Sequence, residues 1–165
     1  MNAIVVFESL WGNTAAIARA VADGIGPQAQ ALHTDEATAA CVSEADLVVC
    51  GAPLLGFSLP TEQMRQNIRQ NPGSGPVPPD LDHPSMRGWV EALPEGGARY
   101  ATFETRIWWS PGSAAKTVAK LLDAKGYVAA APAEKFLVTG RYGPLKAGEV
   151  ERARAWGAQI AAALE

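Results

Sequence analysis

The first residues of the chain that could do chemistry follow a short apolar segment near its start. Residues 9–14 read Ser-Leu-Trp-Gly-Asn-Thr, so two hydroxyls and one amide lie within a single short loop. The β-branched run before the loop predicts a strand over 2–7, and the apolar periodicity after it predicts a helix over 13–24. Backbone N–H groups and the positive end of the helix dipole meet in such a loop, which favours a bound phosphate.

The composition of this loop narrows the kind of phosphate site. A nucleoside-triphosphate loop carries a Lys before its Ser or Thr, and a dinucleotide loop carries three spaced glycines, but neither pattern occurs here. Residues 8–18 contain no Lys, Arg or His. We therefore expect a phosphate held by the hydroxyls of Ser9 and Thr14, the amide of Asn13 and backbone N–H groups. The alternative is an ordinary strand-to-helix turn in which Ser and Thr only cap the helix.

Length and composition bound the fold and the function classes. The 165 residues suit a single domain over 1–165, and 48% hydrophobic residues with a mean hydropathy of −0.01 indicate a globular chain. A net charge of −3 gives no electrostatic reason to expect nucleic-acid binding, and no apolar run is long enough to span a membrane. The start of the chain does not resemble a secretion signal, so we expect a cytoplasmic protein. Cys41 and Cys50 lack metal or redox spacing, and Cys50 is expected to be a small buried hydrophobe.

Strand and helix patterns alternate along the rest of the chain. Strands are predicted over 29–33, 46–51, 98–103 and 134–139, and helices over 61–70, 85–93, 113–125 and 147–164. The proline-rich segment 71–85 indicates a long surface loop. This alternation predicts an α/β fold, in which helices cover both faces of a parallel sheet.

The loop at residues 9–14 and its flanks resemble the phosphate-binding pattern of the flavodoxin family. The positions that match that pattern are Val5, Val6, Phe7, Ser9, Gly12, Thr14, Ala18 and Val21. The resemblance implies a flavodoxin-like three-layer sandwich, with a five-stranded parallel sheet in the order 2-1-3-4-5. It also implies FMN as the cofactor, bound at the carboxyl ends of strands one, three and four. The residues that would surround its phosphate are Ser9, Leu10, Trp11, Gly12, Asn13 and Thr14.

The same resemblance assigns two further loops to the flavin ring. One loop, which would bracket the ring and offer the Gly56 carbonyl to flavin N5, consists of Pro53, Leu54, Leu55, Gly56 and Phe57. The other loop would contribute Thr102, Phe103, Glu104 and Arg106, and beyond them Trp108 to cover the outer face of the ring. Trp109 is the second choice for that cover. The alternative role for the two tryptophans is to dock a partner protein.

Together these expectations favour an electron carrier over an enzyme with its own substrate. The predicted function is a monomeric FMN protein that shuttles electrons between two redox partner proteins, a reductase and an acceptor enzyme. The first alternative is an FMN-dependent NAD(P)H:quinone-type reductase of a small acceptor. The second is a module, with or without flavin, that acts through its Trp and Pro-rich loops. No catalytic or metal-binding residues are predicted: His33 and His83 are expected to be surface residues, and the segment 110–113 to cap a helix.

Overall fold

Six parallel strands form the central sheet of the structure, a computed structural model that describes residues 1–165. The strands are β1 (Ala3–Phe7), β2 (Ala29–His33), β3 (Leu47–Pro53), β4 (Arg99–Arg106), β5 (Val128–Ala129) and β6 (Glu134–Leu137). Their order is β2-β1-β3-β4-β5, and β6 also pairs with β4. This order confirms the predicted α/β sheet.

The strand predicted over 134–139 is β6, which ends at Leu137, and the two-residue strand β5 before it was not predicted. β5 pairs with the first residues of β4, and β6 pairs with its last residues. Pro132 lies between the two short strands and has no backbone N–H to donate to the ladder, so the pairing is interrupted there.

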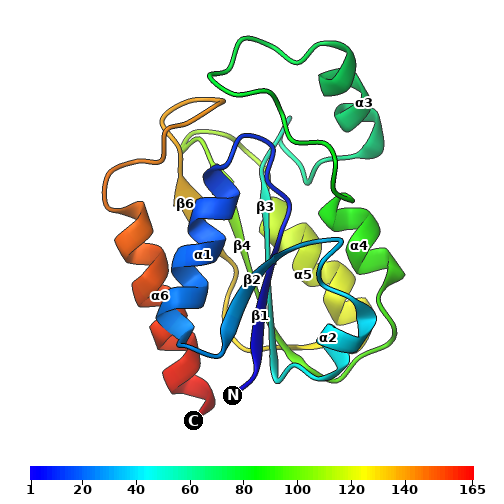
Figure 1. Ribbon diagram of the computed structural model, residues 1–165, viewed down its shortest axis with the longest axis vertical. Helices are drawn as coiled ribbons and strands as arrows, with labels where there is room; N and C mark the ends of the chain where they lie inside the picture. The colour runs from blue at the N-terminus through cyan, green and yellow to red at the C-terminus, as the bar shows by residue number, and fades with distance from the viewer.

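Helices cover both faces of the sheet (Figure 1). One layer consists of α1 (Asn13–Ile25) and α6 (Glu149–Leu164), and the other of α2 (Ala39–Ser43), α4 (Met86–Ala92) and α5 (Ala114–Ala124). The helix α3 (Glu62–Gln70) lies beyond the carboxyl ends of the strands, at the top of Figure 1. The short helix α2 was not predicted; it begins where the Thr38 hydroxyl accepts a hydrogen bond from the Cys41 N–H. None of these helices combines the length and apolar character needed to cross a membrane.

The alternation of side chains along β1 separates two hydrophobic cores. Val5 and Phe7 pack against α1 and α6, whereas Ile4 and Val6 belong to the core under α2, α4 and α5. All four are buried, as expected of a parallel strand that is covered on both faces. The two cores confirm the predicted three-layer sandwich, which leaves the carboxyl edge of the sheet for loops.

Glu149 secures the start of α6 to β6. Its carboxylate accepts hydrogen bonds from the Leu137 N–H at 2.6 Å and from Arg152 at 2.8 and 3.0 Å. Burial alone would raise the pKa of Glu149, but the Arg152 and Leu137 hydrogen bonds outweigh it and hold the pKa below its ordinary value. A lowered carboxyl pKa stabilises the fold above the unfolded-state pKa, and this stabilisation is lost as pH falls through the folded-state pKa.

Replacing Glu149 with Gln is therefore expected to lower the free energy of unfolding at neutral pH by about 1.5–3 kcal/mol, the usual range for hydrogen bonds to a charged group. The difference from wild type should shrink as pH falls below about 4, because the wild-type carboxyl then becomes protonated as well. Urea unfolding at several pH values measures both effects. The control is Glu151→Gln, which removes the same charge from an exposed position in the same turn. Equal losses in the two variants would contradict the role of Glu149.

Candidate functional site

Three loops meet at the carboxyl edge of the sheet and enclose a cleft of about 420 Å³, a size typical of sites for small organic ligands. The loops follow β1, β3 and β4. The predicted site residues that line the cleft are Ser9, Leu10, Trp11, Asn13, Thr14, Pro53, Leu54, Leu55, Gly56, Phe57 and Arg106. The structure thus brings together residues from three segments that are far apart in the sequence.

The loop after β1 leaves backbone donors unpaired at one end of the cleft. Its Gly12 adopts a left-handed conformation (φ 95°) and donates its N–H to the Ser9 hydroxyl at 3.1 Å. No side chain caps α1, and the N–H groups of Asn13, Thr14 and Ala15 have no acceptor within the protein. The interpretation of Ser9 and Thr14 as mere helix caps is therefore wrong. The Thr14 hydroxyl instead lies 2.8 Å from the hydroxyl of Thr105, the residue of β4 that faces it.

Trp11 adds a polar group that lacks a partner. Its indole Nε1–H is buried without an acceptor, and its ring lines the cleft. A buried donor left unpaired costs about 1–3 kcal/mol, which a ligand with a suitable acceptor would recover. The ring meets Tyr142 edge-on at 5.0 Å between centroids.

Arg141 brings a positive charge that sequence reasoning missed. Its guanidinium carbon lies 5.7 Å from the Trp11 ring centroid and 5.5 Å from that of Tyr142, and the side chain lines the cleft. The loop after β1 contains no cation, but Arg141 from the turn after β6 lies beside it. Nothing in the local sequence of residues 9–14 indicates this approach. The other lining residues that were not predicted are Met64, Asn67, Ile68, Thr105, Ile107, Ser110 and Val138.

The loop after β3 forms a tight two-residue turn. The backbones of Leu55 and Ser58 exchange hydrogen bonds of 2.9 and 3.1 Å, and Gly56 and Phe57 between them both have positive φ, at 52° and 67°. A left-handed conformation costs a non-glycine residue about 1–2 kcal/mol, so the position of Phe57 must be held by its surroundings. One such neighbour is Gly112, where an added Cβ would overlap the Phe57 carbonyl.

Thr102, Phe103 and Glu104 lie away from the cleft, because β4 continues to Arg106 instead of ending at 103. Phe103 belongs to the core beside Phe136 and Trp156. The Glu104 carboxylate accepts hydrogen bonds at the start of α5, from the Ala114 N–H at 2.6 Å and the Ser113 hydroxyl at 3.1 Å. The three residues are therefore removed from the candidate site, and Thr105 takes their place.

Comparison with solved structures places this architecture among known folds. Neither a protein-family model nor a curated protein matches the sequence. The structure is similar to a flavodoxin from the domain Archaea, with a TM-score of 0.68 and 21% identity over 98% of this chain and 97% of the other. The chain has a flavodoxin-like fold.

Two further structures support this assignment. A flavodoxin from Streptococcus pneumonia TIGR4 matches with a TM-score of 0.66 and 19% identity, over 99% of both chains. A flavodoxin, WrbA-like protein from Agrobacterium tumefaciens matches with a TM-score of 0.58 and 20% identity, over 98% of this chain and 95% of that one. Identities this low establish the flavodoxin-like fold and leave the chemistry of the cleft to be argued from its residues.

The two tryptophans after β4 are exposed in this flavodoxin-like fold. Trp108 is 74% exposed and Trp109 is 60% exposed, and neither lines the cleft. The predicted cover over the outer face of a flavin is therefore not formed by these side chains as they stand. Phe57, which does line the cleft, is also 57% exposed.

Two smaller expectations about side chains are confirmed. Cys50 is buried, and burial raises the pKa of its thiol to about 12, so it serves as a small hydrophobe of the core. Ser113 caps α5, because its hydroxyl accepts the Lys116 N–H at 3.1 Å.

Proposed function

We propose that this protein binds FMN in the cleft and carries electrons between a reductase and an acceptor enzyme. The observation that supports this most is the set of unpaired N–H groups at the start of α1, which suits the phosphate of a mononucleotide. The structural neighbours include proteins named as flavodoxins. When bound, FMN supplies the capacity to accept and release electrons.

The residues of the cleft fit the two ends of FMN. The hydroxyls of Ser9 and Thr14 would donate to the phosphate, and the Arg141 guanidinium would offset part of its charge. Leu54 and Leu55 offer an apolar wall that excludes water from the ring. The unpaired indole N–H of Trp11 would find its acceptor on the ligand.

The exposed tryptophan pair favours one alternative function. Because neither Trp108 nor Trp109 covers the cleft, a small acceptor could reach a bound flavin directly, as an NAD(P)H:quinone-type reductase requires. The carrier is expected to oxidise NAD(P)H only when a reductase is added, whereas the reductase would turn over NAD(P)H with a quinone on its own. Steady-state assays of the FMN-loaded protein with and without an added reductase separate the two functions.

The position of Trp11 predicts how FMN changes the fluorescence of the protein. FMN is expected to quench tryptophan emission mainly through Trp11, because this ring lines the cleft and the exposed pair does not. The variant Trp11→Phe should lose most of the quenching that saturating FMN produces. The matched control, Trp108→Phe with Trp109→Phe, should keep it. Loss of quenching in the control instead would place the flavin under the tryptophan pair.

A further inference from the structure

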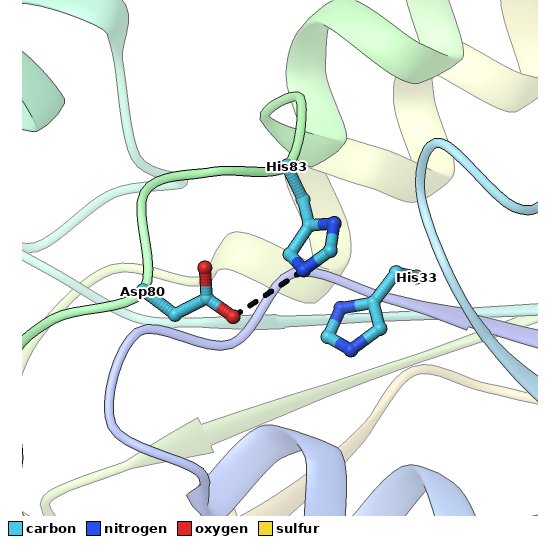
Figure 2. Close-up of side chains that lie close together, drawn as sticks. All are labelled: His33, Asp80 and His83. Atoms are coloured by element: carbon cyan, nitrogen blue, oxygen red, sulfur yellow. Dashed lines mark ion pairs between the residues drawn. The ribbon is translucent and has the colours of Figure 1, made fainter.

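His33, Asp80 and His83 form a cluster outside the cleft (Figure 2). One ligand atom from each residue, a ring nitrogen or a carboxylate oxygen, lies within 4.8 Å of the others. His33 ends β2, whereas Asp80 and His83 belong to the Pro-rich segment 71–85. The chain contains only two histidines, and the fold brings both of them to this one position, although the sequence suggested two separate surface residues.

His83 is held in an orientation that suits metal binding. Its Nδ1 lies 2.8 Å from the Asp35 carboxylate, which keeps a proton on that nitrogen and leaves Nε2 facing Asp80. The distance from Nε2 to the Asp80 Oδ2 is 3.4 Å, shown by the dashed line in Figure 2. Two ligand atoms at 2.0–2.1 Å from a tetrahedral Zn²⁺ ion stand about 3.3 Å apart. The spacing of Nε2 and Oδ2 therefore matches one edge of a tetrahedral site.

His33 lies directly beside this edge. Its ring stacks on His83 with 3.8 Å between centroids and 16° between planes, and its centroid lies 4.5 Å from that of the tilted Phe7 ring. A nitrogen lone pair lies in the ring plane, so the His33 ring must turn from the stack to aim at the same ion. The side chains of the cluster are partly exposed, 28% in the case of His83, which gives an ion access from solvent.

We propose that His33, Asp80 and His83 bind one divalent transition-metal ion of the Zn²⁺ class, with water in the remaining position. Two imidazoles and one carboxylate suit Zn²⁺, whereas Ca²⁺ and Mg²⁺ prefer sites made only of oxygen ligands. Asp35 acts as the outer carboxylate that orients a metal-binding histidine through its other nitrogen. This site is independent of FMN.

The bound ion would fasten the Pro-rich segment to the end of β2. The same segment is connected to the loop after β1, because the Asp80 N–H donates to the Leu10 carbonyl at 2.8 Å. It is also connected to α3, because the His83 carbonyl accepts a hydrogen bond from Arg65 at 2.5 Å. The metal site therefore serves as a structural clamp on one side of the cleft.

Calorimetric titration of the chelator-treated, full-length protein with Zn²⁺ near neutral pH tests the proposal. We expect one ion per chain, and an affinity that falls more than about 100-fold in His33→Gln and in His83→Gln. Asp35→Asn, which removes only the orienting carboxylate, should lose about 10–100-fold. Asp82→Asn, an exposed position in the same segment, is the matched control and should bind Zn²⁺ as the wild type does. Binding that persists unchanged in both histidine variants, or the absence of wild-type binding below about 1 mM, would overturn the proposal.

A second measurement uses the wild-type protein alone, so it does not depend on the folding of a variant. Because there are only two histidines, NMR of the imidazole protons has only two rings to distinguish. One equivalent of Zn²⁺ should shift the resonances of both rings, with no further change beyond that ratio. Resonances that stay in place, or a shift confined to one ring, would contradict a site that uses both histidines.

Discussion

The double variant Ser9→Ala with Thr14→Val is expected to bind FMN more weakly by about 2–5 kcal/mol, which is roughly 30-fold to several thousand-fold in affinity. Both hydroxyls line the end of the cleft where the first-turn N–H groups of α1 lack acceptors. Losing two hydrogen bonds to a doubly charged phosphate accounts for this range. Fluorescence titration of the flavin-free protein with FMN measures the change.

Two controls restrict this effect to the phosphate. Riboflavin has no phosphate, so its affinity should be nearly the same for the double variant and the wild type. Thr102→Val removes another buried hydroxyl of the same sheet, one that has no hydrogen-bond partner and lies outside the cleft, and should leave FMN binding unchanged. Equal losses for FMN and riboflavin would mean that the variant disturbs the cleft as a whole.

Replacing Arg65 with Met is expected to destabilise the fold by about 3–5 kcal/mol. Arg65 and Glu8 form an ion pair at 2.8 Å, with side chains only 5% and 3% exposed. Arg65 also donates to the carbonyls of Leu81 and His83, so it connects α3 to the Pro-rich segment. Its removal leaves the Glu8 carboxylate buried with one remaining donor, the Met86 N–H at 2.9 Å.

The loss in this variant should depend on pH. Burial raises the pKa of Glu8, although the Met86 N–H and Arg65 oppose that rise. A carboxyl whose pKa is raised in the folded state binds a proton more readily there than in the unfolded chain. Lowering the pH from the raised folded-state pKa to the ordinary pKa of about 4.3 therefore favours the folded state. Without Arg65 the Glu8 pKa rises further. The stability lost in Arg65→Met should therefore be smaller just above a pH of about 4.3, the ordinary Glu pKa, than at neutral pH.

Urea unfolding of three proteins tests this account of the buried pair. Arg69→Met is the matched control, because Arg69 lies one turn along α3 on its exposed side and makes only a 3.4 Å contact with Leu81. Arg69→Met should lower the free energy of unfolding by less than about 1 kcal/mol. Adding Glu8→Gln to Arg65→Met should recover part of the lost stability, because it removes the unpaired charge. A double variant that is less stable than Arg65→Met would contradict this explanation.

The part of the site that a single stretch of the chain forms could be predicted from the amino-acid sequence. The loop of residues 9–14 joins a strand to a helix, and this order alone places its N–H groups at the carboxyl edge of a parallel sheet. The alternation of strands and helices likewise indicates the layers. Arg141 could not be found in this way, because its approach to Trp11 depends on how the turn after β6 returns across the sheet edge.

The predicted and observed ends of a strand differ where the strand continues through buried polar residues. Glu104 resembles a loop residue, yet β4 continues through it because the strand pairs there with β3 on one side and β6 on the other. The separation of the unpredicted strand β5 from β6 is indicated by Pro132, which interrupts the ladder between them. No sequence signal indicates that the His33 and His83 rings stack, because this contact depends on the path of the Pro-rich segment.

Stepwise anaerobic reduction of the FMN-loaded protein, followed by absorption spectra and electron counting, tests the central claim most directly. A carrier between two proteins must accept electrons one at a time. We therefore predict two resolved one-electron steps, the first completed before the second begins. A single two-electron step, with no spectrum other than those of the oxidised and fully reduced flavin, would contradict the carrier and favour the small-acceptor reductase.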